Sequence, residues 1–145
     1  MANPTSFDTA LGFDFGLRFV GVAVGQTITG SASPLTTLVA QQGQVHWPDI
    51  DKLITTWQPD ALVVGIPLNM DGTEQAITQA ARSFQQELET RYHLPVFGMD
   101  ERLSTREAKE KIFAAQGYKG LSRHAINAVS AQLILESWLT MLSRS

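Results

Sequence analysis

The amino-acid sequence predicts an α/β fold with a five-stranded mixed sheet that is flanked by helices. Two strand-like runs joined by a tight turn, with a third extended run after them, are typical of an antiparallel three-stranded meander. Helical and strand patterns then alternate, which favours two further strands that are parallel to the first. Two helical segments are predicted at the C-terminal end of the sequence.

The meander is predicted at residues 11–16, 19–25 and 31–39. The first two runs are apolar and close together, so we expect them to form a hairpin. Pro34 lies inside the third run and has no N–H group to donate to a neighbouring strand. We therefore expect an edge position or an irregularity at this point of the sheet.

The middle of the sequence alternates between helix and strand. Residues 46–57 are predicted as a helix with a proline near its first turn, and residues 61–67 as a strand that is buried on both faces. A loop is expected over 68–75. A long helix is expected to begin near Gly72, because Asp71 and Glu74 have the spacing of a capping box. Its apolar stripe comprises Ile77, Ala80, Ala81, Phe84, Leu88 and Tyr92.

The last part of the sequence predicts one more strand and two helices. The strand covers residues 95–101, and a second capping box, Ser104 with Glu107, opens a helix that ends near Gly117. Ser122 is expected to cap a final helix that runs to about Leu142. This order of elements is the one found in ribonuclease-H-like domains.

Length and composition limit the class of protein. With 145 residues, the sequence predicts a single domain over 1–145, with a flexible N-terminal tail over 1–9. No apolar run approaches the roughly 20 residues that span a bilayer, and no secretory signal is present. The sequence has no cysteine, which excludes disulfides and thiolate metal sites. We therefore expect a cytoplasmic protein that does not interact with membranes.

The charge is unevenly distributed along the chain. The net charge is −3, but residues 101–124 hold six of the eleven Lys and Arg residues and only three acidic residues. One interpretation is a solvated helix face, and the other is a local patch that contacts phosphate on an otherwise acidic protein.

Asp14 stands out because it lies between Phe13 and Phe15 in a strand-like run. A carboxylate in such a run is costly unless something compensates its charge. Side chains alternate along a strand, so Asp14 shares its face with Gly12 and Gly16. We interpret these glycines as clearance for a hard cation or a metal–phosphate complex. The alternative is an aspartate that accepts a hydrogen bond from a nearby turn amide.

Glu101 is the second candidate, since it lies where a strand ends and just before a capped helix. Open sheets place their chemistry at the carboxyl ends of strands. Two-metal phosphoryl chemistry requires carboxylates from separate elements, and Asp14 and Glu101 could supply two of them. The neighbouring Asp100 is expected to point the other way. The alternative for Glu101 is a surface ion pair with Arg102 or Arg106.

Four segments, "LGFDFGLRFVGVAVGQ", "VVGIPLNMDGTEQ", "DERLSTREA" and "SAQLILESW", resemble the bacterial YqgF (RuvX) family. The resemblance covers about residues 10–142. It implies a ribonuclease-H-like nuclease related to Holliday junction resolvases, with pre-16S ribosomal RNA as the assigned substrate and Mg²⁺ or Mn²⁺ as the cofactor. Asp14 matches the acid of the family's first strand, and Glu101 matches the acid of its "DER" motif.

The third acid of the family corresponds to Asn127 in this sequence, within "INAVSAQLILES". Helical spacing places Asn127 above an apolar stripe, so we expect it to point toward the sheet. An asparagine oxygen can still bind a hard cation but brings no negative charge. This favours a nuclease of reduced activity. The alternatives are a protein that binds nucleic acid without cleaving it and a structural asparagine bonded to the sheet or a loop.

Residues just past the strands and in the basic stretch are candidates for contacts with nucleic acid. They are Arg18, Asn69, Thr73, Arg102, Arg106 and Lys109, and the alternative for each is an ordinary role in a turn or cap. The expected partners are structured RNA such as pre-rRNA, or branched DNA, together with the ribosome. A Holliday junction resolvase is the alternative enzyme, and it would require a homodimer to cut both strands.

Overall fold

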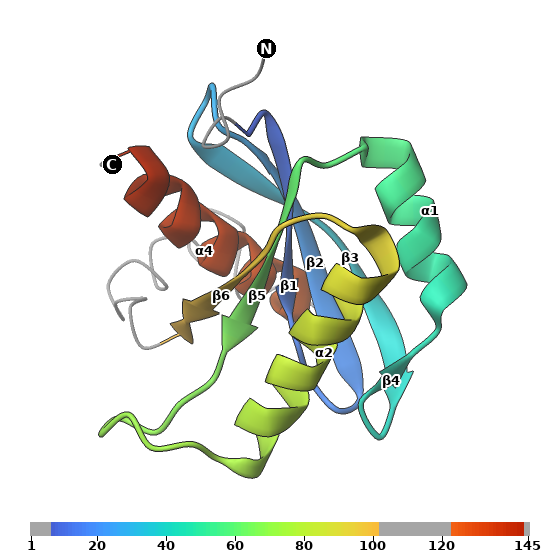
Figure 1. The fold of residues 1–145 in the computed structure, drawn as a ribbon, viewed down its shortest axis with the longest axis vertical. Helices are drawn as coiled ribbons and strands as arrows, with labels where there is room; N and C mark the ends of the chain where they lie inside the picture. The colour runs from blue at the N-terminus through green and yellow to red at the C-terminus, as the bar shows by residue number, and fades with distance from the viewer. Residues whose placement is uncertain (1–6, 102–122, 144–145) are drawn as a thin grey trace.

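The computed structural model describes residues 7–101 and 123–143, and its elements follow the predicted order (Figure 1). The strands are β1 (Thr9–Asp14), β2 (Phe19–Gln26), β3 (Ser31–Gln41), β4 (Gln44–Val45), β5 (Ala61–Ile66) and β6 (Val96–Asp100). The helices are α1 (Trp47–Trp57), α2 (Ala76–Tyr92) and α4 (Arg123–Ser143). The helix expected between Ser104 and Gly117 lies outside the described residues. No helix in the described ranges is long and apolar enough to cross a membrane.

The strands form one mixed sheet in the order β4-β3-β2-β1-β5-β6. The meander is antiparallel, and β5 and β6 are parallel to β1. The mixed sheet with flanking helices is therefore confirmed. The register between β2 and β3 shifts between Val22 and Ala23, and Pro34 lies opposite Ala23. The irregularity expected at this proline is thus present.

The prediction of five strands is wrong by one, because β4 adds a short edge strand. Gln42 and Gly43 have positive φ angles of 52° and 83°. Positive φ at both central residues is typical of a two-residue hairpin turn, which returns the chain onto β3. Ala40 then pairs with Val45, and Gln41 pairs with Gln44.

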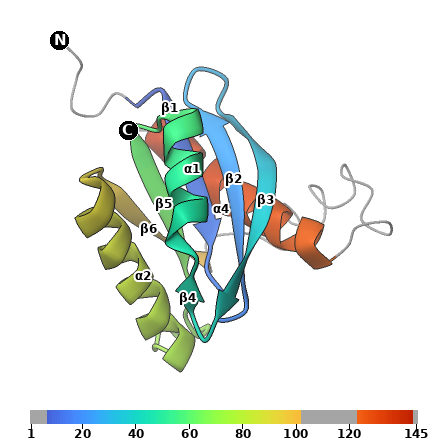
Figure 2. The same ribbon diagram turned by 90° about the vertical axis from the view of Figure 1, so that its right-hand side faces the viewer.

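The sheet separates two layers of helices, with α1 and α2 on one face and α4 on the other (Figure 2). The α1–α2 face buries bulky side chains, among them Leu11, Phe13, Val20, Val22 and Phe84. The α4 face buries smaller strand residues, Ala10, Ala23 and Ala61, against Ala131, Leu135 and Trp138 of the helix. Small strand residues let the axis of α4 approach the sheet closely, which fixes where the N-terminus of this helix lies.

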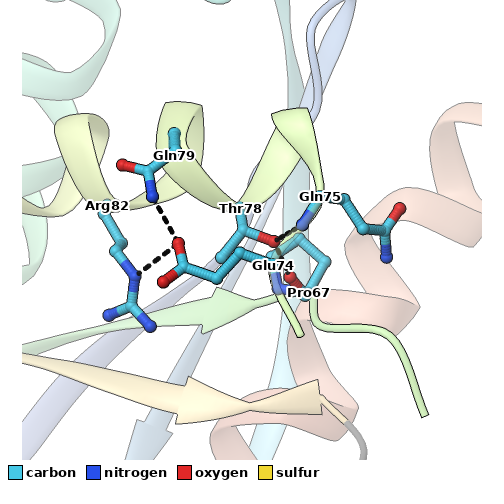
Figure 3. A network of polar contacts seen from close by, with 6 residues as sticks. All are labelled: Pro67, Glu74, Gln75, Thr78, Gln79 and Arg82. Carbon is cyan, nitrogen blue, oxygen red and sulfur yellow. Dashed lines mark hydrogen bonds and ion pairs between the residues drawn. The ribbon is translucent and has the colours of Figure 1, made fainter. Parts of the chain in front are cut away.

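Helix α2 begins at Ala76, four residues later than predicted, because hydrogen bonds of Gln75 and Thr78 fix its first turn (Figure 3). Gly72 has a φ of 90°, which is incompatible with a right-handed helix. Gln75 is the residue before the helix, and its backbone N–H donates to Thr78 Oγ1 at 2.9 Å. Thr78 Oγ1 donates in turn to the carbonyl of Pro67, which ties the start of α2 to the end of β5. The capping box expected at Asp71 and Glu74 is therefore wrong.

Glu74 instead stabilises the outer side of α2. Its carboxylate accepts a hydrogen bond from Gln79 Nε2 and lies 3.5 Å from Arg82 Nε (Figure 3). Both partners of this ion pair are about half exposed, so we expect it to contribute little to stability.

The two helices on the bulky face contact each other through aromatic side chains. Trp47 of α1 stacks on Phe84 of α2, with ring centroids 5.8 Å apart, and Arg91 lies over the Trp47 ring at 4.1 Å. Tyr92 Oη donates to Asp51 Oδ1 at 2.6 Å. Partial burial, and then this bond to Asp51, raise the pKa of Tyr92 above its ordinary value.

Residues 7–9, which the sequence analysis assigned to a flexible tail, instead contact the rest of the fold. Thr9 already belongs to β1, and the ring of Phe7 packs against Phe97 and Trp138 with centroids 5.8 Å and 5.9 Å away. Thr27 Oγ1 also donates to the carbonyl of Phe7. Because the free energy falls when a phenylalanine ring leaves water, this contact holds residues 7–9 on the α4 face.

Candidate functional site

Asp14 is the last residue of β1 and is partly buried. It shares the α4 face of the sheet with Gly12, whereas Phe13 belongs to the opposite core. Its pairing partner on β2 is Gly21. On the other side, Phe13 pairs with Val64, so Gly65 is the next residue of β5 beside Asp14. The carboxylate therefore lies at the end of β1 between two strands that each present a glycine.

Glu101 directly follows β6 and lies over β5. A Cβ atom built on Gly65 would be 2.7 Å from Glu101 Oε1 and 3.2 Å from its Cγ. Ile134 Cδ1 of α4 approaches the same point at 2.5 Å. The Glu101 carboxylate thus occupies the space that a side chain at position 65 would need, on the same face as Asp14.

Asn127 lies in the first turns of α4, beside the partner of Asp14. The oxygen of its backbone carbonyl would be 1.9 Å from a Cβ atom on Gly21, and the carbon of the same backbone carbonyl would be 2.4 Å away. Only a glycine at position 21 allows this approach of helix to strand. The fold therefore brings Asp14, Glu101 and Asn127 together at one corner, where β1 and β5 end and α4 begins.

The glycines around Asp14 have a different role from the one we expected. A Cβ atom on Gly12 would lie 2.9 Å from Leu135 Cβ, and one on Gly16 would lie 2.6 Å from the carbonyl oxygen of Phe19. Gly12 thus makes room for α4, and Gly16 makes room for the hairpin backbone. The interpretation of these two glycines as clearance for metal and phosphate is wrong.

Two carboxylates and one amide make up the candidate site. In the described part of the chain, no group of three or more His, Asp or Glu side chains could hold a metal ion. Glu136 does not replace the missing acid, because its Oε1 accepts from Ala32 N at 3.2 Å and from Gln132 Nε2 at 3.4 Å. The bond from Ala32 N fastens α4 to the start of β3.

Asn69 and Thr73 belong to a tight turn between β5 and α2. Asn69 Nδ2 donates to Thr73 Oγ1 at 2.9 Å, and Thr73 Oγ1 donates to Asp71 Oδ1 at 2.6 Å. The backbone N–H of Thr73 also donates to Asp71 Oδ1 at 3.0 Å. In the structure these side chains shape the turn, and the nucleic-acid contacts expected of Asn69 and Thr73 stay predictions.

The basic candidates differ in where they lie. Arg18 is exposed in the turn between β1 and β2, close to the β3–β4 hairpin, where its carbonyl accepts from Ala40 N at 2.8 Å. Arg102, Arg106 and Lys109 lie outside the described residues, as does most of the basic stretch over 101–124. Among the basic candidates, Arg18 is therefore the one whose position the described residues include.

A family model that matches this chain is described as a resolvase, and two of its relatives are named as nucleases. The family model described as RuvX, Holliday junction resolvase, matches residues 8–141. A relative from Shewanella denitrificans is 54% identical over 134 residues, which cover 92% of this chain and 95% of that one. One from Haemophilus ducreyi is 55% identical over 130 residues, which cover 90% and 94%. Both are named "Putative pre-16S rRNA nuclease".

Solved structures confirm the fold. RuvC of T. thermophilus in complex with a Holliday junction substrate matches 92% of this chain and 94% of its own, with a TM-score of 0.57 and 15% identity. The yeast mitochondrial Holliday junction resolvase matches 94% and 80%, with a TM-score of 0.58 and 10% identity. At this level of identity the likeness concerns the arrangement of helices and strands.

Proposed function

The chain belongs to the RuvX family, and on this premise we propose that it is a metal-dependent endonuclease for structured nucleic acid. The proposed substrate is pre-16S ribosomal RNA, which is the substrate in the names of its relatives, and we propose its 5′ end as the place of cleavage. The proposed reaction is hydrolysis of a phosphodiester bond.

One observation supports this proposal: Asp14, Glu101 and the backbone of Asn127, from distant parts of the chain, lie at neighbouring positions of one corner of the sheet. Gly65 leaves space for the Glu101 carboxylate. Gly21, which pairs with Asp14, leaves space for the backbone of Asn127. Carboxylates gathered at strand ends suit phosphoryl chemistry, because this chemistry requires positive charge to be held beside the phosphate. A purely structural corner would not require two partly buried acids.

The donor set at this corner fits a hard cation. Asp14 and Glu101 offer carboxylate oxygens, and Asn127 offers an amide oxygen, which are the ligand types that Mg²⁺ and Mn²⁺ take in proteins. We propose that these three residues hold the ion. When bound, the ion supplies Lewis-acid activation of water and stabilises the leaving oxygen.

The residues of the chain supply position and charge. Asp14 is fixed by the ladder between β1 and β2, and Glu101 is confined between Gly65 and Ile134. Preorganised charges at a reacting centre are worth more than mobile ones, because no reorganisation is needed during the reaction. In this proposal Arg18 binds a phosphate of the same strand, beside the corner.

Asn127 favours a second candidate function, a protein that binds RNA or junctions without cleaving them. An amide in place of a carboxylate lowers the negative charge of the site by one and weakens its hold on a divalent cation. We propose that this chain keeps reduced activity, since two carboxylates remain and the amide can still coordinate.

Exchanging Asn127 for aspartate separates these two functions. We expect Asn127→Asp to raise the cleavage rate by about tenfold, because one more unit charge near the cation is worth on the order of 1–2 kcal/mol. The measurement is cleavage of a pre-rRNA 5′-end substrate and of a four-way DNA junction at several Mg²⁺ and Mn²⁺ concentrations. A wild type that is inactive beside an active Asn127→Asp would identify a binding protein, and preferred junction cleavage would identify a resolvase.

A methyl group at position 65 should displace the Glu101 carboxylate. In Gly65→Ala the new Cβ would lie 2.7 Å from Glu101 Oε1, too close for both to keep their positions, so we expect the cleavage rate to fall by roughly 100-fold. The same Cβ would also collide with Ile134 Cδ1. The double variant Gly65→Ala, Ile134→Val removes that second collision. It should recover stability in a denaturant titration while its activity stays low; recovery of both would show that Glu101 is not needed.

The wider setting of the reaction follows from the proposed substrate. Because the proposed substrate is a precursor of ribosomal RNA, we propose a ribosomal precursor particle in the cytoplasm as the working partner. A homodimer is required only for the resolvase alternative, which cuts two strands.

A further inference from the structure

The hairpin between β3 and β4 presents three glutamine side chains to solvent. Gln41 ends β3, Gln42 is in the turn, and Gln44 begins β4. All three are exposed, and within the described part of the chain none of their amides has a hydrogen-bond partner. A side-chain amide offers two donors and one acceptor. The hairpin therefore holds three amide groups that are available to a ligand.

Two of these amides lie on the same face of the sheet as Asp14. Ala40 and Val45 pair across the hairpin, and both belong to the core of the α1–α2 face. Because side chains alternate along a strand, the next pair, Gln41 and Gln44, points to the α4 face. Residues that are directly opposite each other have Cβ atoms about 5 Å apart, so the two amides can bind neighbouring groups of one ligand.

Backbone hydrogen bonds fix the hairpin to the β1–β2 turn, which lies beside it (Figure 2). Gly43 N donates to the carbonyl of Leu17 at 2.9 Å, and Ala40 N donates to the carbonyl of Arg18 at 2.8 Å. Leu17 and Arg18 follow Asp14 by three and four residues in the chain. The position of the hairpin relative to the acidic corner is therefore set by the backbone.

The distance from the corner to the hairpin follows from the strand register. Asp14 pairs with Gly21, and Gly21 pairs with Thr37, which is four residues before Gln41. Neighbouring strands are about 4.8 Å apart and each residue advances a strand by about 3.3 Å, so Gln41 lies on the order of 15 Å from Asp14. A structured nucleic acid that is bound at Asp14 can therefore contact the hairpin as well.

The charge around the hairpin is small. The hairpin lines a hollow of about 1150 Å³ in which, among the described residues, Arg18 is the one Lys or Arg and Asp49 is the one acid. Arg18 can hold one phosphate, whereas binding of a nucleic acid by charge alone needs many such contacts. The glutamine amides instead suit groups that both donate and accept hydrogen bonds. The 2′-hydroxyl of RNA is such a group, and DNA lacks it.

The shape of the hairpin also favours RNA. Strand β4 has two residues, which span about 7 Å, so the hairpin is a short ribbon. The minor groove of an RNA helix is wide and shallow and displays 2′-hydroxyls and base edges, so a short ribbon can reach them. The alternative, the major groove of DNA, is about 8.5 Å deep, and a ribbon that reads its floor must enter that far.

We infer that the β3–β4 hairpin binds the minor groove of an RNA helix, with the amides of Gln41 and Gln44 on 2′-hydroxyl groups and Arg18 on a phosphate. The inference rests on the proposed nuclease function. It adds that this chain selects RNA over DNA through direct contacts to the sugar, and that the substrate is base-paired beside the cleaved bond.

The double variant Gln41→Ala, Gln44→Ala tests the hairpin and leaves the acidic corner intact. The probes are a fluorescein-labelled RNA duplex of about 16 base pairs and the DNA duplex of the same sequence. Fluorescence anisotropy in EDTA measures binding without cleavage. The wild type should bind RNA about tenfold more tightly than DNA, as expected for two additional hydrogen bonds. The double variant should bind RNA and DNA about equally, because its loss is confined to RNA.

Gln86→Ala is the matched control, since Gln86 is an exposed glutamine of α2, which covers the other face of the sheet (Figure 2). This variant should keep the RNA preference of the wild type within about threefold. Melting curves verify that each variant is folded. If the double variant does not fold, the single variants Gln41→Ala and Gln44→Ala are measured, and each should lower the RNA preference by about threefold.

The outcomes for the inference and for the proposed function differ. Equal binding of RNA and DNA by the wild type, tighter binding of DNA, or an RNA preference that the glutamine variants keep would overturn the inference. An RNA preference that depends on Gln41 and Gln44, without cleavage by wild type or Asn127→Asp in Mg²⁺ or Mn²⁺, would uphold the inference and remove the nuclease function.

Discussion

Asp14→Asn is expected to lower the cleavage rate by about 10²- to 10³-fold, the loss typical of removing one preorganised charged or polar group from a reacting centre. Asparagine has nearly the same shape as aspartate, so the pairing of residue 14 with Gly21 is retained. What is lost is a unit of negative charge that faces the α4 side of the sheet. The Asp14→Asn variant should therefore fold normally but bind the cation more weakly.

A second readout makes this prediction independent of any substrate. A ligand that binds only the folded state raises its stability, so Mg²⁺ or Mn²⁺ should raise the melting temperature of the wild type. In Asp14→Asn this rise should disappear, while the melting temperature in EDTA stays about the same. A thermal unfolding series over metal concentration measures both quantities.

Asp100→Asn is the matched control. Asp100 ends β6 and directly precedes Glu101. Because side chains alternate along a strand, Asp100 lies on the same face as Val96, which belongs to the α1–α2 core. Glu101 continues the face of Met99, which belongs to the α4 core. We therefore expect Asp100→Asn to cleave within about threefold of the wild type. If Asp14→Asn cleaved as fast as this control, the acidic corner would not be the catalytic site.

Much of this corner could be predicted from local patterns. The glycine-flanked aspartate in an apolar run predicted a strand acid, and the strand-end position of Glu101 predicted its companion. The resemblance supplied the correspondence of Asn127 in α4, which no local pattern marks. The patterns around Asp14 and Glu101 each involve only a few neighbouring residues, and such short patterns can be recognised in a sequence from the alternation of side chains in strands and their spacing in helices.

What could not be predicted depends on contacts between distant residues. Gly12 and Gly16 were assigned to ligand clearance because a sequence does not show that Leu135 approaches one and the Phe19 carbonyl the other. The start of α2 was misplaced since the bond from Thr78 to the Pro67 carbonyl exists only in the folded chain. Strand β4 was missed because a two-residue strand has no periodicity to read.

Gly21 carries the strongest structural constraint of the described glycines, and Gly21→Ala should destabilise the protein by more than about 3 kcal/mol, at the upper end of the cost of overpacking. The new Cβ would meet Asn127 O at 1.9 Å, Asn127 C at 2.4 Å and Ala128 N at 3.0 Å. All three are backbone atoms, which cannot rotate away as a side chain would. The start of α4 must therefore move away from β2.

The same displacement should carry Asn127 away from Asp14, so folded Gly21→Ala protein is expected to lose activity beyond its loss of stability. The control is Gly98→Ala on β6, where the new Cβ would lie 3.1 Å from Gln85 Oε1 and from Ile66 Cγ1. These are side-chain atoms that can give way, so its free energy of unfolding should change by less than about 1 kcal/mol. Denaturant titrations of both variants give the comparison. If Gly21→Ala were as stable as Gly98→Ala, α4 would not pack against Gly21. The contact proposed to hold Asn127 beside Asp14 and Glu101 would then be absent.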